Sequence, residues 1–211
     1  MKIKQFTFNP VQLNTFVAYD ETQECVIIDA GCFFPGEEKA LSDFIEKENL
    51  KPVRLLNTHG HFDHVFGVNF VQKKYNLTHE GNAADNVWIE QMPARASVFG
   101  FTDIQPIESM PKPLKEGDVV IFGNSKLEVL EVPGHSAGSL VYYSAADKIL
   151  FAGDVLFRGS IGRTDLPQGD YGTLIRNIRQ KLFTLPPETI VYPGHGEPTT
   201  IGWEKAHNPF F

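Results

Sequence analysis

The feature that most constrains this chain is a short segment that places three imidazoles and one carboxylate within six residues, His59-Gly60-His61-Phe62-Asp63-His64. Alternation along an extended backbone would put the side chains of His59, His61 and Asp63 on one side. Imidazole and carboxylate together are typical ligands of zinc, iron and manganese. The segment therefore predicts a metal site.

Polar residues also stand at the ends of several predicted strands. These strand ends are Asp29, His59, Gly134-His135, Gly153-Asp154 and Gly194-His195. In α/β architectures functional side chains gather at strand ends, because the loops there are free to present them. We expect these strand ends to build one shared site.

Alternation and short apolar runs predict the strands. They are Ile3–Phe8, Thr15–Tyr19, Cys25–Asp29, Val53–Asn57, Leu127–Val132, Leu140–Tyr143, Lys148–Phe151 and Thr189–Tyr192. Helical periodicity predicts helices at Gly36–Leu50, 64–74, roughly 83–91 and after a capping Asp170. The stretch from Met92 to Pro113 is predicted to be irregular. Since long loops are usually functional, we expect it to form a wall of the substrate pocket, with Phe99 and Phe101 as substrate contacts.

Composition narrows the class of protein. A chain of 211 residues suits one domain, residues 1–211. The net charge of −7 and the lack of Lys or Arg runs speak against a nucleic-acid partner, and no apolar stretch is long enough for a membrane span. With two cysteines, Cys25 and Cys32, and no export signal, we expect a cytoplasmic protein that acts on a small molecule.

The pattern His-x-His-x-Asp-His resembles the signature of the metallo-β-lactamase superfamily. Later segments agree in order, namely Pro133-Gly134-His135-Ser136, Phe151-Ala152-Gly153-Asp154 and Tyr192-Pro193-Gly194-His195-Gly196. The resemblance covers essentially the whole chain. It implies an α/β (α+β) fold, a four-layer αβ/βα sandwich of two mixed sheets with helices on the outer faces and the metals at one edge.

The resemblance also implies a ligand set for two divalent ions. One ion is held by His59, His61 and His135, the other by Asp63, His64 and His195, and Asp154 bridges them. Zinc is the expected metal, with iron or manganese as alternatives. Cations about 3.5 Å apart need a carboxylate and a hydroxide between them, and the bound hydroxide is the expected nucleophile. Asp63 and Asp154 are accordingly the predicted catalytic residues.

The segment Ser160–Pro167 and the ending Gly194–Gly202 resemble short glyoxalase-II-like (hydroxyacylglutathione hydrolase-like) proteins without a helical C-terminal domain. This resemblance implies hydrolysis of small acyl thioesters, whose thiolate leaves readily. Arg163 takes the place of a basic residue that holds glutathione, while Asp165 replaces the family's tyrosine. Arg163 is therefore expected to bind an anion, and its alternative is a salt bridge to Asp165 or Asp170.

Other interpretations stay open. Gly162-Arg163-Thr164-Asp165 also resembles persulfide dioxygenases, which use one iron on two histidines and a carboxylate. A non-catalytic metal-binding module is a further alternative, and a closed metal coordination shell would favour it. A β-lactamase is disfavoured by the lack of an export signal, and a nuclease by the lack of a basic surface. His79 is predicted to lie on the surface, and no role is expected for His207 or the cysteines.

Overall fold

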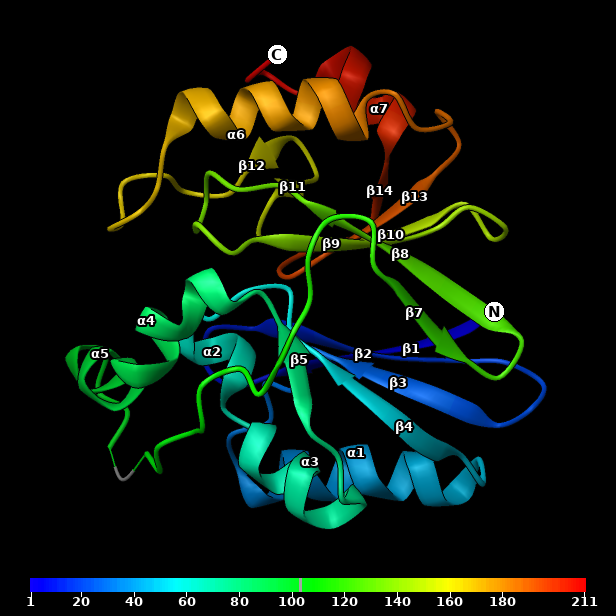
Figure 1. The fold of residues 1–211 in the computed structure, drawn as a ribbon, viewed down its shortest axis with the longest axis vertical. Coiled ribbons are helices and arrows are strands. Elements are labelled where there is room, and N and C mark those ends of the chain that lie inside the picture. The colour runs from blue at the N-terminus through cyan, green and yellow to red at the C-terminus, as the bar shows by residue number, and fades with distance from the viewer. Residues whose placement is uncertain (103) are drawn as a thin grey trace.

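The computed structural model describes residues 1–102 and 104–211, which form four layers (Figure 1). Within these residues two mixed six-stranded sheets pack face to face. Helices α1 (Pro35–Lys47) and α3 (Val68–Tyr75) cover the outer face of the first sheet. Helix α6 (Tyr171–Asn177), its continuation Ile178–Leu182 and α7 (Ile201–His207) cover the second. The sandwich expected from the sequence is confirmed.

The first sheet has the strand order β1-β2-β3-β4-β5-β6. Its strands are β1 (Lys2–Phe8), β2 (Leu13–Tyr19), β3 (Glu24–Ile28), β4 (Lys51–Leu56), β5 (His79–Gly81) and β6 (Lys112–Pro113). Strands β1 to β3 form the antiparallel meander that their alternation predicts. From β3 to β6 the pairing is parallel, so these strands point their carboxyl ends to one edge of the sheet.

The second sheet has the order β14-β13-β10-β9-β8-β7. Its strands are β7 (Val119–Phe122), β8 (Ser125–Glu131), β9 (Leu140–Ser144), β10 (Ile149–Gly153), β13 (Ile190–Pro193) and β14 (Thr199–Thr200). Only β10 and β13 pair in parallel among these described strands, so the sheet is mixed. A small hairpin of β11 (Leu156–Phe157) and β12 (Ser160–Ile161) follows β10.

Apolar side chains hold the layers together on both faces of each sheet. In β2, Phe16 and Ala18 face the second sheet, whereas Val17 faces the layer of α1. The Phe16 ring meets that of Phe151 across the two sheets, with centroids 5.3 Å apart. Strands buried on both sides appear in sequence as continuous apolar runs, as Cys25–Ile28 does.

Helix ends follow local chemistry. Helix α1 begins at Pro35, whose fixed φ suits a first turn, and the Glu37 carboxylate accepts hydrogen bonds from the amides of Phe33 and Phe34. Asp170 caps α6 as predicted, by accepting a hydrogen bond from the amide of Thr173 at 2.6 Å.

One predicted helix and one predicted irregular stretch need correction. The predicted helix 64–74 is split into α2 (Phe62–Val65) and α3, with Gly67 between them. A side chain at Gly67 would start 2.3 Å from Cys32 Sγ, so this close approach needs glycine. The stretch from Met92 is not wholly irregular, because Met92–Val98 forms helix α5, with a proline in its first turn. The predicted helix at 83–91 is present as a turn at Ala83–Asp85 followed by α4 (Asn86–Glu90).

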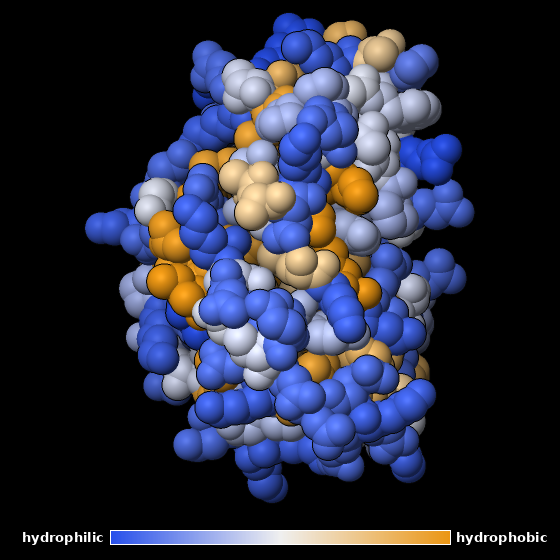
Figure 2. All heavy atoms as spheres, turned by 90° about the vertical axis from the view of Figure 1, so that its right-hand side faces the viewer, coloured by the Kyte–Doolittle hydropathy of each residue, from blue (hydrophilic) through white to orange (hydrophobic). Residues whose placement is uncertain are grey.

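At the right-hand end in Figure 1, polar turns join the two sheets. Asp20, which follows β2, accepts hydrogen bonds from Asn124 N and Ser125 Oγ, both at 2.8 Å. Figure 2 shows this side as mainly hydrophilic, with hydrophobic atoms gathered across its middle. Among the described residues no helix combines the length and apolar character that a bilayer crossing needs.

Candidate metal centre

All seven predicted ligand residues come together where loops from the two sheets meet. His59 and His61 lie on the loop after β4, and α2 carries Asp63 and His64. The other three lie in loops after strands of the second sheet, namely His135 after β8, Asp154 after β10 and His195 after β13. The prediction that separate strand ends share one site is thus met by the geometry.

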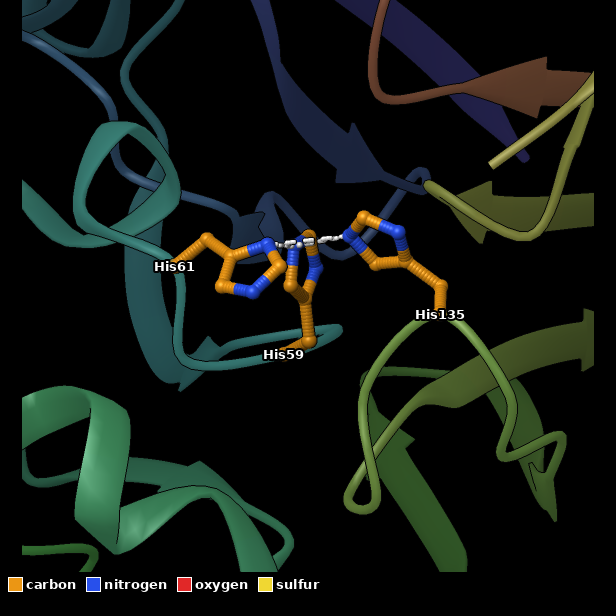
Figure 3. A group of neighbouring side chains, drawn as sticks. All are labelled: His59, His61 and His135. Atoms are coloured by element: carbon orange, nitrogen blue, oxygen red, sulfur yellow. Dashed lines mark hydrogen bonds between the residues drawn. The ribbon is translucent and has the colours of Figure 1, made fainter. Parts of the chain in front are cut away.

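Three imidazoles form the first donor group (Figure 3). His59 Nε2 lies 3.0 Å from His61 Nδ1 and 3.2 Å from His135 Nε2, and the latter two nitrogens are 2.9 Å apart. A four-coordinate zinc ion about 2.0–2.1 Å from each nitrogen would separate them by roughly 3.3 Å. The spacing of the three nitrogens therefore fits a single cation.

The protonation state of this group suits metal binding. Burial lowers the pKa of His59 well below its usual value, and the neighbouring imidazoles add to this effect. Burial, with His135, also lowers the pKa of His61 to about 3. Both rings are neutral at physiological pH, so lone pairs converge on one point.

Asp63, His64 and His195 form the second group. His195 Nε2 lies 3.2 Å from Asp63 Oδ2, and His64 Nε2 lies 3.7 Å from the same oxygen. Asp154 stands between the groups, with Oδ1 3.3 Å from His64 Nε2 and Oδ2 3.7 Å from His135 Nε2. Its two oxygens thus reach both groups, as a bridging carboxylate must.

Two buried atoms of this second region show that a positive charge belongs there. Among the described residues, His64 Nε2 and Asp154 Oδ1 have no hydrogen-bond partner. Although burial opposes it, the carboxylates of Asp154, Asp29 and Asp63 raise the pKa of His64 well above its usual value. Oxygen and nitrogen donors that together favour a cation suit zinc, iron or manganese.

Asp29 orients His64. His64 Nδ1 donates to Asp29 Oδ2 at 2.9 Å, which leaves Nε2 facing the site. Asp29 also accepts hydrogen bonds from the amide and the hydroxyl of Thr58, at 2.7 and 2.6 Å. Asp29 has a φ of +52°, so the carboxylate is held by a turn that few residue types adopt. The sequence marked Asp29 as a strand end without assigning it this function.

Asp85 joins the two loops of the first group, and the sequence analysis missed it. Its Oδ2 accepts hydrogen bonds from Gly60 N at 2.9 Å and Ser136 Oγ at 2.7 Å, and its Oδ1 from Gly138 N at 2.7 Å. A side chain on Gly138 would start 2.7 Å from this carboxylate. Buried Asp85 thereby fixes the loop of His59 and His61 against that of His135.

The N-terminal hairpin holds His195. His195 Nδ1 donates to the carbonyl of Gln12 at 3.2 Å, so its Nε2 faces the donor group. Asn14 Nδ2 donates to the carbonyls of Pro193 and Gly196, at 3.1 and 2.8 Å. The start of β2 thus sets the position of a loop from the other sheet.

A cavity of about 280 Å³ opens beside the two donor groups. Its lining residues are Val11, His61, Phe62, Asp63, Trp88, Arg95, Val98, Phe99, His135, Asp154, Arg163, Leu166 and His195. Phe99 contributes to this wall, with 63% of its surface exposed. Phe101 does not, because it is buried against Phe33 and Phe66, with ring centroids 5.2 and 5.0 Å away. Of the two predicted substrate contacts, only Phe99 lines the cavity.

Arg163 lines the cavity, and its side chain is paired with one of the two predicted carboxylate partners, Asp165. Its guanidinium forms two hydrogen bonds with the Asp165 carboxylate, each 2.7 Å long, which is the salt bridge considered as its alternative. Its carbonyl accepts a hydrogen bond from His135 Nδ1 at 2.8 Å. Arg163 therefore orients a site imidazole through its backbone while its side chain is paired.

The prediction that His79 lies on the surface is wrong. His79 is fully buried in β5, and its Nε2 donates to the carbonyl of Glu108 at 2.8 Å. A three-residue strand carries too little periodicity to reveal burial. His207 is exposed and stacks on Trp203, with ring centroids 5.1 Å apart. Cys25 and Cys32 are free, and burial raises the pKa of each thiol to about 12.

Comparisons with known proteins agree with this geometry. The chain is 37% identical to the hydroxyacylglutathione hydrolase GloC of Haemophilus influenzae, over 100% of this chain and 98% of the relative. TTHA1623, solved in a di-iron-bound form, is 36% identical with a TM-score of 0.88, over 99% of this chain and 100% of that chain. The B3 metallo-β-lactamase BLEG-1 is 37% identical with a TM-score of 0.90, over 99% of each chain.

The model of one family spans nearly the whole chain. It matches residues 9–195, a range that contains every residue of both donor groups. The four layers, the donor groups between the sheets and this match agree. This chain belongs to the metallo-β-lactamase superfamily.

Proposed function

We propose that this protein is a binuclear metal-dependent hydrolase of small acyl thioesters. The observation that carries the proposal is the pair of donor groups, which share Asp154 and border one cavity of about 280 Å³. That volume is at the lower end of the range for ligand pockets and suits a small substrate. Likeness to a hydroxyacylglutathione hydrolase supports a thioester as the substrate.

Each donor group would hold one divalent ion, with Asp154 as their common ligand. Bound there, the ions would lower the pKa of a water molecule and polarise the substrate carbonyl. Zinc suits the nitrogen-rich first group, and iron is the alternative because TTHA1623 was solved with two irons. The contacts of Asp29, Gln12 and Arg163 would fix which nitrogen of His64, His195 and His135, respectively, faces the ion.

The chain's own residues would supply the remaining requirements. Without metal, although burial opposes it, His64 holds the pKa values of Asp63 and Asp154 below their usual range, and bound cations would keep both carboxylates ionised in its place. The rings of Phe62 and Phe99 give the cavity an apolar wall that limits access of water to the acyl group. A thiol leaves as a thiolate near neutral pH, so the site needs no strong general acid.

Hydrolysis of β-lactams is a second candidate function. The likeness to BLEG-1, which is described as a B3 metallo-β-lactamase, favours it. The two free, buried cysteines support instead a protein that works in a reducing compartment such as the cytoplasm.

A metal count and a substrate panel test the proposal. Elemental analysis of the purified protein should give two ions per chain. The panel contains S-lactoylglutathione, simple acetyl thioesters, a lactone, a β-lactam, and glutathione persulfide with measurement of oxygen uptake. We expect thiol release from the thioesters. One iron per chain with oxygen uptake and no thiol release would establish the dioxygenase instead, and opening of the β-lactam alone would establish the second candidate.

A further inference from the structure

Two arginines line the cavity, and they differ in what neutralises them. Arg163 is exposed and forms its two hydrogen bonds with the Asp165 carboxylate, so this pair is neutral as a unit. Arg95, on α5, is partly buried, and its Nε and Nη2 donate to one uncharged oxygen, Gln91 Oε1, at 3.0 and 2.8 Å. Within residues 1–102 and 104–211, Arg95 has no ion pair. The uncompensated positive charge of the cavity wall is therefore that of Arg95.

The guanidinium of Arg95 is held in a fixed plane. Its central carbon lies 4.0 Å from the centroid of the Trp88 ring, a cation–π contact that, with the two hydrogen bonds to Gln91, limits its movement. A guanidinium has five N–H donors, and Gln91 engages two, so the edge that carries Nη1 remains available. A pre-oriented edge of this kind suits a carboxylate, which can accept two parallel hydrogen bonds.

Trp88 adds an independent observation. Trp88 lines the cavity and is 4% exposed, and among the described residues its indole N–H has no acceptor. A buried donor without an acceptor is costly, but this N–H is enclosed by protein, so the contribution of the ring to the site is its contact with the Arg95 guanidinium. The same ring meets the His61 ring edge to face, with centroids 4.4 Å apart. One indole therefore separates the first donor group from the guanidinium of Arg95.

We propose that Arg95 determines specificity by selecting acyl thioesters that carry a carboxylate. This inference rests on the proposed thioester hydrolysis. The chain has a net charge of −7, which repels anions at long range, and Asp63 and Asp154 would offset part of the charge of the bound ions. Binding of a carboxylate away from the reacting carbonyl therefore needs a further cation at the cavity. Arg95 supplies that cation at the cavity, and no carboxylate among residues 1–102 and 104–211 is paired with it.

Matched substrates separate charge from size. One pair is the acetyl thioester of 3-mercaptopropionylglycine and its primary amide, which places the carboxylate on the thiol portion. The other is a succinyl thioester of N-acetylcysteamine and its succinamoyl amide, which places it on the acyl portion. We expect the native enzyme to prefer the acid in at least one pair, by about 10- to 100-fold in kcat/KM. In Arg95→Gln that ratio should fall toward one, mainly through a higher KM for the acid.

Arg176→Gln is the matched control. Arg176 is exposed on α6, outside the cavity, and like Arg95 it donates to a neutral oxygen, Thr173 Oγ1. This variant should keep the native ratio. If Arg95→Gln lowers kcat/KM equally for the acid and the amide, the inference is overturned and Arg95 has a structural role. Loss of the ratio in Arg163→Gln, with its retention in Arg95→Gln, would overturn it in favour of Arg163.

A binding measurement makes the inference independent of turnover. The chain has two tryptophans, so Trp203→Phe leaves Trp88 as the fluorescent reporter. The probe is S-hexyl-3-mercaptopropionylglycine, a thioether that cannot be hydrolysed, added to the metal-loaded protein beside its amide. We expect the acid to change Trp88 fluorescence with a Kd at least about tenfold lower than that of the amide, and Arg95→Gln to remove this difference. Selective binding without thioester cleavage would refute the proposed function alone, whereas equal binding of acid and amide would refute the role of Arg95.

Discussion

Replacement of Asp85 by alanine tests how the two loops of the first donor group are held. The change would leave Gly60 N and Gly138 N without acceptors, whereas the Ser136 hydroxyl keeps Ser139 Oγ at 2.8 Å. Each orphaned buried N–H costs about 1–3 kcal/mol, which gives roughly 2–6 kcal/mol. Burial raises the pKa of Asp85, so the buried charge is itself costly and its removal offsets part of the loss. We expect Asp85→Ala to lose about 2–4 kcal/mol of unfolding free energy.

The loss would appear in two measurements. Urea unfolding of chelator-treated protein should show the lower stability, and Tm should fall by on the order of 10 °C. Zinc affinity, measured by competition with a chromophoric chelator, should fall about 10- to 100-fold, because the imidazoles would lose their fixed orientation. Asp43→Ala is the control, since Asp43 is exposed on α1 and its ion pair among the described residues is with Lys39 alone. Its effect should stay within about 0.5 kcal/mol.

Two outcomes for Asp85→Ala would contradict these expectations. If Asp85→Ala unfolds within about 0.5 kcal/mol of the native protein and binds zinc as tightly, then Asp85 does not hold the loops together. A fall in stability with native zinc affinity would show that Asp85 stabilises the fold without positioning the ligands.

Three further predictions follow from single side chains. Phe101→Ala should cost about 3 kcal/mol in urea unfolding, because Phe101 is buried, whereas exposed Phe99→Ala should stay within about 0.5 kcal/mol and raise the KM for acyl thioesters. Asp20→Asn should be less stable than the native protein at pH 7. Burial of Asp20 raises its pKa, but hydrogen bonds from Thr22, Ser125 and Asn124 outweigh this effect and hold the pKa at about 2. A carboxylate whose pKa is lower in the folded than in the unfolded chain stabilises the fold at pH values above its unfolded pKa. The difference in urea midpoint between the native protein and Asp20→Asn should therefore shrink as pH falls from about 4 toward 2. A difference that does not change with pH would show that the ionised Asp20 carboxylate is not its cause. Asp154→Ala should bind at least one ion fewer by elemental analysis and lose thioester hydrolysis by several orders of magnitude; retention of two ions and near-native turnover would exclude its bridging function.

The convergence of the candidate ligand residues was predictable because it depends on short-range patterns. The spacing within His59–His64 is fixed along the chain, and His135, Asp154 and His195 each follow a recognisable strand. Strand ends in an α/β sandwich meet at one edge, so the topology alone brings these residues together.

Residues that act through contacts between distant segments have no such pattern in the sequence. Asp85 lies in a segment with an ordinary helical pattern, and its partners Gly60, Ser136 and Gly138 are 25 to 53 positions away in sequence. Arg95 was missed because α5 is a single short helix in a stretch that lacks clear periodicity. The family resemblance predicted that a basic residue stands at position 163. It did not decide whether the guanidinium of Arg163 binds an anion or pairs with Asp165, as it does in the structure.

The arrangement separates the candidate metal centre from the part of the cavity that would select a substrate. Each donor group combines residues from loops of both sheets, and protein contacts already join those loops, through Asp85 on one side and Asn14 on the other. The donor geometry is therefore a property of the sandwich. Arg95 and Phe99 lie on or beside α5, which meets the centre through Trp88. Substitutions on α5 can thus alter which substrate fits while the donor groups keep their geometry, which is how one metal centre can serve different substrates on one fold.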